Sequence, residues 1–354
     1  MSGRILVGDS RDTLLNLADA TVHCVVTSPP YFGLRDYGVP GQMGLEQTPD
    51  EYVAEMVSLF SEVRRVLRDD GTLWLNLGDS YAANRSCQVA RTKGGPKHGP
   101  AQAASGRGQR ATDYGLKPKD LIGIPWRVAF ALQADGWYLR QDIIWHKPNP
   151  MPESVRDRCT KAHEYIFMFS KSPRYFYDHE AIKTPAKESS VARIRQATFA
   201  SQSGGEKDYA NGVNPNRSMR KTLENWAKHD KQRGHGRRHA GFNARWDSMS
   251  KSDQMALGAN KRSVWSVATK PFKGAHFATY PPELIEPCIL AGCPAGGTVL
   301  DPFFGAGTTG LVAESLGRNW IGCELNPEYA QIARQRIYGE IVPSQPLVAW
   351  LTAA

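Results

Sequence analysis

The stretch VVTSPPYFGLRDYG, residues 25–38, places a small hydroxyl and two prolines directly after a β-branched run. Each proline lacks a backbone N–H and fixes φ, so the pair ends a strand and forms a rigid loop. Open α/β sheets bind ligands at loops of this kind, at the ends of their strands. Ser28, Pro29, Pro30 and Tyr31 are therefore candidate functional residues, and an ordinary turn is the alternative interpretation.

The stretch TVLDPFFGAGTTG, residues 298–310, has the pattern of a strand, a glycine turn and a helix. Gly305 and Gly307 allow a ligand to approach the backbone, and the helix N-terminus offers free N–H donors. The spacing matches neither G-x-G-x-x-G nor a P-loop, and a tight structural turn is the alternative.

Two acids indicate which ligand this second stretch would bind. Asp301 ends its strand and Glu324 ends the next one. An acid about 20 residues after such a turn can hydrogen-bond both hydroxyls of a ribose. We therefore expect a cofactor that carries a ribose, with Asp301 facing its cationic or amine portion. S-adenosylmethionine, which has a ribose, an ammonium and a sulfonium, meets this description.

The two stretches, TSPPY and DPFFGAGTT, together resemble the hallmark pair of DNA amino-methyltransferases. The catalytic loop comes before the cofactor loop, as in the beta class. The segments IIWHKPNPMPESVRDRCTKAHEYIFMFSKS and GAHFATYPPELIEPCI also look like parts of this class. The resemblance covers most of residues 1–180 and 263–340. It implies an α/β, Rossmann-like methyltransferase fold: a mostly parallel, doubly wound sheet with circularly permuted motifs and an inserted target-recognition module.

The implied activity is methyl transfer from S-adenosylmethionine to the exocyclic amine of a DNA base that has flipped out of the duplex. The Ser28 hydroxyl and the Pro29 carbonyl are suited to accept the amine hydrogens, and Tyr31 offers a stacking face. No metal and no covalent nucleophile is needed. In this family Ser before Pro-Pro accompanies cytosine N4 more often than adenine N6, so cytosine N4 is favoured. Adenine N6, an RNA substrate and a non-catalytic nucleic-acid-binding protein stay open as alternatives.

The resemblance also implies further cofactor contacts. Asp9 fits the position that meets the adenine amine, and residues 276–279 fit the segment that packs on the methionine end. The full expected set is Asp9, Thr27, His276, Phe277, Thr279, Asp301, Pro302, Phe303, Gly305, Gly307, Thr308, Thr309, Glu324 and Leu325.

Hydrophobic periodicity and turn residues predict the elements that position these groups. The expected strands cover residues 3–9, 21–27, a segment within 69–79, 138–147, 297–303 and 319–325, with a hairpin of 163–172 and 174–179. The expected helices cover residues 10–17, 50–67, 125–134, 281–290, 308–316 and 327–338, with Thr48 or Asp50 as the cap of the second. Strands that alternate with helices favour a parallel, doubly wound sheet.

Charge is distributed unevenly along the 354 residues, whose formal net charge is +9. Residues 84–119 carry +7 and residues 181–262 carry +10, which leaves −8 on the rest of the chain. Clustered cations favour a polyanionic partner, here double-stranded DNA. We expect residues 84–119 to close over DNA phosphates and residues 181–262 to form the target-recognition module. Residues 1–180 and 263–354 would then form the catalytic domain.

Several classes of protein are disfavoured. The chain has no apolar run of about 18 residues and no secretory leader, so a cytoplasmic protein associated with the nucleoid through DNA is expected. Six cysteines without a C-x-x-C pair argue against a zinc site or disulfides. Cys288, after Pro287, is expected to be a buried thiol and not the nucleophile of a cytosine C5 methyltransferase. His235 and His239 suit phosphate contact better than metal binding. A homodimer and a cognate restriction endonuclease are left open as partners.

Overall fold

The computed structural model describes residues 3–82, 116–185, 258–270 and 279–339. The strands are β1 Gly3–Val7, β2 Val22–Thr27, β3 Leu67–Leu77, β4 Tyr138–His146, β5 His163–Ser170, β6 Val264–Ser266, β7 Thr298–Asp301 and β8 Asn319–Glu324. The helices are α1 Ser10–Leu15, α2 Pro49–Val66, α3 Ile124–Ala134, α8 Pro282–Gly292, α9 Thr308–Ser315 and α10 Pro327–Tyr338.

These strands form one sheet in the order β1-β8-β7-β2-β3-β5-β4-β6. The five neighbouring strands β1, β8, β7, β2 and β3 are mutually parallel. Strand β5 is antiparallel to both β3 and β4, and the short β6 runs parallel to β4. The sheet therefore has a parallel half, made of β1, β8, β7, β2 and β3, and a mixed half, made of β5, β4 and β6. The predicted mostly parallel sheet is confirmed.

Helices cover both faces of the sheet, as alternation along β3 shows. Leu73 and Leu75 belong to the hydrophobic core that includes α2 and α3. The intervening side chains of Thr72 and Trp74 point the other way, against Gly292 of α8. On α8, Cys288 is 1% exposed, so the expectation of a buried thiol is confirmed.

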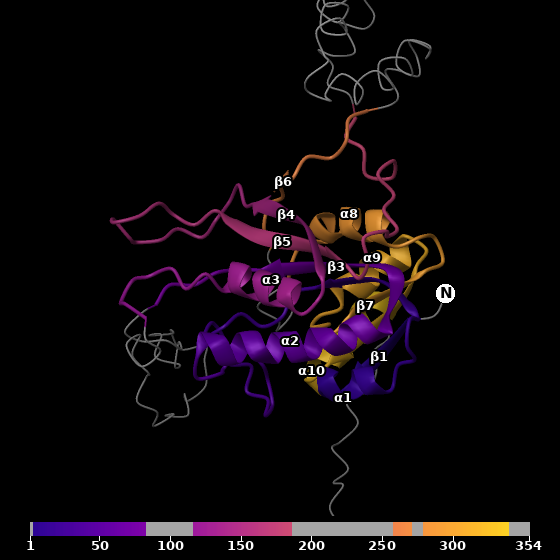
Figure 1. Cartoon of the computed structure of the whole chain (residues 1–354), viewed down its shortest axis with the longest axis horizontal. Coiled ribbons are helices and arrows are strands. Elements are labelled where there is room, and N and C mark those ends of the chain that lie inside the picture. The colour runs from indigo at the N-terminus through magenta and orange to yellow at the C-terminus, as the bar shows by residue number, and fades with distance from the viewer. Residues whose placement is uncertain (1–2, 83–115, 186–257, 271–278, 340–354) are drawn as a thin grey trace, which may run out of the picture. The chain divides into compact units, whose positions relative to one another are not determined.

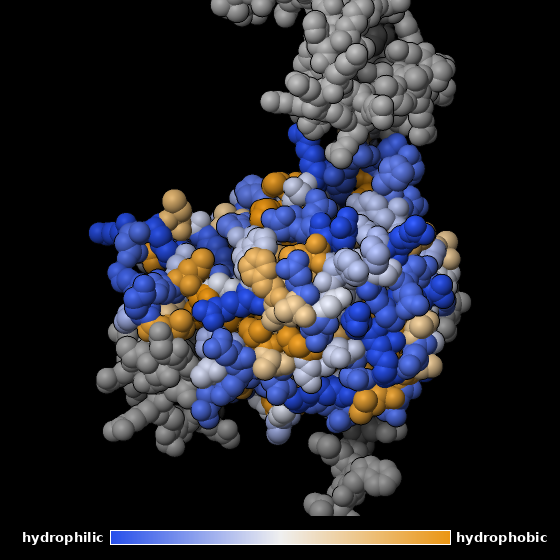
Figure 2. All heavy atoms as spheres, viewed as in Figure 1, coloured by the Kyte–Doolittle hydropathy of each residue, from blue (hydrophilic) through white to orange (hydrophobic). Residues whose placement is uncertain are grey.

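Helix α2 shows how local sequence sets the boundaries. Thr48 is its N-cap, and the Thr48 hydroxyl accepts from the Glu51 N–H while the Glu51 carboxylate accepts from the Thr48 N–H. This capping box satisfies two orphan donors, and Pro49 suits the first helical turn. Hydrophobic residues gather over α2 and α3 on the face shown in Figure 2, among hydrophilic ones.

The expected hairpin between residues 163–172 and 174–179 is wrong. Strand β5 instead inserts between β3 and β4, with Phe167 paired to Leu75 on one side and to Asp142 on the other. Residues 174–179 form no strand. The aromatic alternation there reflects packing, because Tyr177 stacks on Trp74 with ring centroids 6.4 Å apart.

Residues 182–261 form a separate unit. The structure describes only its two ends, 182–185 and 258–261, where Thr184 pairs with Ala259. This division lies close to the boundaries expected from composition, and the recognition role of the unit stays a prediction. His235, His239 and most of the basic segment 84–119 lie outside the described residues. In the described ranges, no helix is long and apolar enough to span a membrane.

Candidate active site

A cavity of about 920 Å³ lies at the carboxyl ends of the parallel strands. Its wall unites the two motifs, which are far apart in sequence. The first motif contributes Ser28, Pro29, Pro30 and Tyr31, and the second contributes Pro302, Phe303, Gly305 and Thr308. Glu324, the last residue of β8, and Leu325 after it also line the cavity. Parallel strands end at one edge, so a loop after β2 and a loop after β7 become neighbours. Asp9 and Thr279 also line the cavity.

The loop after β2 is fixed from below by α2. The Tyr52 hydroxyl donates to the Pro30 carbonyl at 2.8 Å, and the Tyr52 ring packs against Phe32 with centroids 5.7 Å apart. Among the described residues, no donor reaches the Pro29 carbonyl. The Pro30 carbonyl therefore has a structural partner, while the Pro29 carbonyl keeps its acceptor capacity.

Tyr31 is held by a polar network that joins both halves of the sheet. Its hydroxyl donates to Glu164 Oε2 at 2.7 Å and lies 3.2 Å from Asn76 Oδ1. The Asn76 amide donates to the Tyr165 carbonyl at 3.0 Å. Glu164 also forms an ion pair with Lys147. Burial and the Glu164 charge raise the pKa of Tyr31 well above its ordinary value, while a hydrogen bond with Ser28 lowers it.

A glycine gives the Tyr31 ring its place. A Cβ added at Gly78 would lie 2.4 Å from Tyr31 Cε2, a distance that real Cβ atoms do not show. The ring therefore rests against the Gly78 backbone. A larger residue at position 78 would displace either the ring or the backbone at the end of β3.

Asp301 lies behind the cavity wall and not on it. The carboxylate is 1% exposed and accepts from the Thr27 hydroxyl at 2.6 Å and from the Phe303 N–H at 3.0 Å. Its other oxygen accepts from the Thr309 hydroxyl at 2.6 Å and from the Tyr280 hydroxyl at 3.1 Å. Burial raises the pKa of Asp301, and these bonds oppose the rise.

This hydroxyl cage around Asp301 ties β2, β7 and α9 together. Asp301 was expected to face a cationic part of the cofactor. In the structure its carboxylate is instead enclosed by four protein donors. Thr27, Gly307 and Thr309 likewise do not line the cavity. Gly307 has φ +76°, and a Cβ there would lie 2.8 Å from the Ala333 Cβ, so this glycine lets α9 pack on α10.

Glu324 presents a carboxylate to the cavity at the end of β8. Its Oε2 accepts from the Gly305 N–H at 2.7 Å and its Oε1 accepts from the Asn326 N–H at 2.8 Å. Each oxygen keeps a second lone pair for another donor. Burial raises the pKa of Glu324, and the two backbone bonds oppose the rise. With Phe303 and Leu325 beside it, this acceptor pair fits the hydroxyls and flat ring of a nucleoside.

Asp9 caps α1 and also lines the cavity. Its carboxylate accepts from the Arg11 N–H at 2.9 Å and forms an ion pair with the Arg11 guanidinium at 2.6 Å. Burial alone would raise the pKa of Asp9, but the bonds with Arg11 outweigh it and the pKa is lowered. Its contact with an adenine amine stays a prediction. His276 and Phe277 lie outside the described residues.

Sequence reasoning missed Asn76 on β3 and Glu164 on β5, two polar residues that line the cavity. Asn76 stands between two leucines near the end of β3 and is only 4% exposed, and Glu164 is the second residue of β5. A buried polar residue in a strand needs a partner, which was the available signal. Lys147 and Lys161 also line the cavity. The Lys161 ammonium donates to the Asp79 carbonyl at 2.5 Å, and burial lowers the pKa of Lys161.

Curated relatives match nearly the whole chain. The Type II methyltransferase M.XycI of Xanthomonas campestris pv. cyanopsidis is 45% identical over 94% of this chain and 87% of its own length. M.Cfr9I of Citrobacter freundii has the same identity and coverage. M.SmaI of Serratia marcescens is 44% identical over 95% of this chain and 91% of its own.

Solved structures share the fold. The PvuII DNA methyltransferase, described as cytosine-N4-specific, superposes with a TM-score of 0.56 at 18% identity, over 97% of this chain and 88% of that one. A DNA modification methylase of Thermus thermophilus, solved with S-adenosyl-L-methionine, gives 0.52 at 23% identity, over 97% and 96%. The predicted Rossmann-like methyltransferase fold is thereby confirmed. The predicted cofactor, S-adenosylmethionine, is confirmed by membership of the methylase family. The sequence model of the DNA methylase family matches residues 22–335, and the chain belongs to this family as a beta-class DNA amino-methyltransferase.

Proposed function

We propose that the enzyme methylates N4 of cytosine within a specific DNA sequence. The observation that carries this proposal is Ser28, a hydroxyl and not a carboxylate, beside Pro29 on the cavity wall that also includes Glu324. In the family that the chain resembles, serine in this place accompanies cytosine N4 more often than adenine N6.

The wall supplies what an exocyclic amine needs in order to react. The lone pair of such an amine is delocalised into the ring, so attack requires the nitrogen to become more tetrahedral. The Ser28 hydroxyl oxygen and the Pro29 carbonyl can each accept one amine hydrogen, which favours that geometry. Bound S-adenosylmethionine supplies the methyl group. Tyr31, fixed by Glu164 and Gly78, offers a stacking face that holds the base in line, a proximity effect.

The charge near Tyr31 also supports cytosine. Lys147 pairs with Glu164, and Lys161 bonds to Asp79, next to Gly78. An ammonium has three donors, so each lysine keeps hydrogens for a ligand. On its pairing edge, beside N4, cytosine offers two acceptors, N3 and O2, whereas adenine offers only N1 beside N6. Two cationic donors on one wall match the cytosine edge better.

The product base is tested by mass spectrometry of nucleosides from DNA of cells that express the enzyme. We expect N4-methylcytosine with the wild-type enzyme and much less of it with Ser28→Ala. A new N6-methyladenine peak would overturn the cytosine assignment.

Methylation-sensitive sequencing of the same DNA gives the recognised site. Labelled methyl transfer to duplex DNA, tRNA and rRNA completes the test, because incorporation only into RNA would exclude DNA as the substrate.

Affinity for S-adenosylmethionine is expected to fall as the pH falls, through Glu324. Burial raises the Glu324 pKa, so the carboxylate protonates at a higher pH than an exposed glutamate and loses acceptor capacity for the ribose hydroxyls. The dissociation constant should rise as the pH falls from about 8 towards about 4, by about 10-fold once the carboxylate is fully protonated and one charge-assisted hydrogen bond is lost. Asp9, with its lowered pKa, stays ionised for longer.

Glu324→Gln is the matched control for this titration. Its affinity should be weak at pH 8 and nearly independent of pH. Protonating a group whose folded-state pKa is raised favours the fold, so Glu324 contributes no acid unfolding that could mimic the effect. Isothermal titration calorimetry measures the dissociation constant at each pH. An equal pH dependence in wild type and variant would contradict the proposed role of Glu324 in binding the ribose.

The proposal extends to partners and location. Three relatives are named Type II methyltransferases. We propose a cognate endonuclease that cuts the same site when it is unmethylated, and a cytoplasmic enzyme held at the nucleoid by its substrate. Challenge of methylated and unmethylated DNA with lysates of the source cells tests the first point. Cleavage of both DNAs alike would contradict it.

A further inference from the structure

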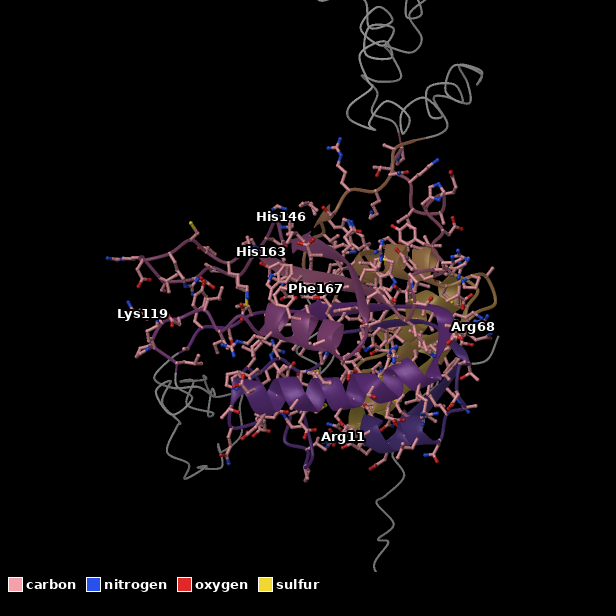
Figure 3. The ribbon with its side chains drawn as sticks, in the orientation of Figure 1. Arg11, Arg68, Lys119, His146, His163 and Phe167 are labelled. Carbon is pink, nitrogen blue, oxygen red and sulfur yellow. The ribbon has the colours of Figure 1, made fainter. Side chains whose placement is uncertain are left out.

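The connection between β4 and β5, residues 147–162, extends away from the sheet (Figure 1). We refer to it as the β4–β5 loop. His146 and His163 are register partners at its base, and Figure 3 shows them at the end of the sheet from which the loop leaves. Five of its residues besides Lys147 line the cavity that holds the two motifs: Asn149, Pro150, Met151, Glu153 and Lys161.

The base of the loop is fixed by hydrogen bonds on both sides. The Lys147 N–H donates to the Ala162 carbonyl at 2.8 Å. The Asn149 side chain donates to the Thr269 carbonyl at 3.0 Å and accepts from the Thr269 N–H at 2.9 Å. These contacts hold the loop as one wall of the cavity.

Ion pairs brace the outer part of the loop. Arg158 pairs with Glu153 at 2.5 Å, and its guanidinium lies 3.9 Å from the centroid of the Tyr81 ring. Asp157 pairs with Lys119 at 2.6 Å, and Figure 3 shows Lys119 on the segment below the loop. The loop geometry is therefore supported along its length.

Met151 stands on this braced loop with 86% of its surface exposed, more than any other large hydrophobic residue in the described ranges. Single exposed apolar residues are common and by themselves mean little. This one also lines the active cavity, and it lies between Pro150 and Pro152, whose fixed φ angles keep the backbone from folding back over it. An apolar side chain is thereby presented at the edge of the pocket that receives the target base.

The charge beside Met151 suits a DNA backbone. Arg156 is exposed, and no described residue forms an ion pair with it. The acids of the loop, Glu153 and Asp157, are already paired with Arg158 and Lys119. A free guanidinium on the loop can therefore bind a phosphate at low cost in rearrangement.

We propose that the β4–β5 loop contacts the duplex beside the target base and that Met151 enters the base stack where that base has left it. Apolar wedges of this kind offset the cost of unstacking, and flipping costs least when the base is weakly paired. Arg156 binds the adjoining phosphate. This inference rests on the proposed DNA methyltransferase function, and it holds for either target base.

The test compares Met151→Ala with Met151→Leu, on oligonucleotide duplexes that carry the site found by sequencing. One duplex is fully paired, and the other has an abasic position opposite the target base. On the paired duplex, Met151→Ala should lower the single-turnover rate about 10-fold, and Met151→Leu about twofold or less. On the abasic duplex the wild-type and Ala rates should agree within about twofold, because no base pair must be broken.

Val155, 40% exposed on the same loop, provides the matched control. Val155→Ala should leave the rate on both duplexes within about twofold of wild type. Met151→Ala that behaves like Val155→Ala, or that loses as much on the abasic duplex as on the paired one, overturns the wedge. Wild-type protein that methylates no DNA overturns the proposed function instead, so the two failures are distinct.

Arg156 gives an independent measurement. Arg156→Gln should reduce the slope of the logarithm of DNA affinity against the logarithm of salt concentration by about 1, as expected for one phosphate contact. Fluorescence anisotropy with the paired duplex measures this slope. An unchanged slope would contradict the proposed contact between Arg156 and the DNA backbone. Dissociation constants for S-adenosylmethionine should stay the same in all these variants.

Discussion

Ser28→Ala is expected to lower kcat by about 100-fold or more, the usual effect of removing one preorganised group that acts on the reacting atom. The variant loses the hydroxyl oxygen that we propose accepts an amine hydrogen, while the Pro29 carbonyl stays in place. The cavity wall around Glu324 is untouched, so affinity for S-adenosylmethionine should change by about twofold or less. Single-turnover methylation of a duplex substrate and calorimetry of cofactor binding measure the two quantities separately.

Ser10 supplies a matched control for Ser28. It also lines the cavity, but its hydroxyl donates to the Pro302 carbonyl on the cofactor side. Ser10→Ala should therefore weaken cofactor binding more than it slows methyl transfer. A normal kcat in Ser28→Ala would contradict the acceptor role. Loss of cofactor binding in Ser28→Ala would instead show that the Ser28 loop belongs to the cofactor side of the cavity.

Tyr31→Ala is expected to lower kcat/KM about 5- to 150-fold, the range that corresponds to about 1–3 kcal/mol of base–aromatic stacking. Tyr31→Phe keeps the ring but loses the bond to Glu164. It should keep most of the activity if stacking is the main contribution. Equal losses in the two variants would transfer the role from the ring to the hydroxyl and its Glu164 partner.

Gly78→Ala reaches the same ring from the other side. The added methyl would lie only 2.4 Å from Tyr31 Cε2, so the ring or the backbone at the end of β3 must shift although the chemistry of the ring is unchanged. We expect an activity loss close to that of Tyr31→Ala, with cofactor affinity retained. Combining Gly78→Ala with Tyr31→Ala should restore space and add little further loss, because the two changes act on one ring. Fully additive losses would show that Gly78 acts elsewhere.

The elements nearest to the site were predictable because their signals are local. Thr48 and Glu51 mark the start of α2 by a capping box, and the β-branched runs before Ser28 and before Asp301 indicate buried strands. The partner of a strand is not encoded locally. The sequence therefore suggests pairing of β5 with residues 174–179, whereas in the fold β5 pairs with β3 and β4.

The site was predictable to a similar degree. The loop from Ser28 to Tyr31 and the acid Glu324 were each predicted as site residues, and both line the cavity. The surroundings of Asp301 could not be foreseen, because Thr27, Tyr280 and Thr309 come from separate elements that only the tertiary fold brings together. The same holds for Glu164, which reaches Tyr31 because β5 lies between β3 and β4.

Two sets of strands divide the cavity wall between them. Strands β1, β7 and β8 carry Asp9, the glycine turn and Glu324, while β3, β4 and β5 lead to Asn76, Lys147 and Glu164. In the proposed mechanism the first set holds the methyl donor and the second set the acceptor base, so mutations on the second set would alter the choice of acceptor without disturbing the donor. Natural or laboratory evolution could therefore change the acceptor base on this scaffold while the methyl donor stays the same.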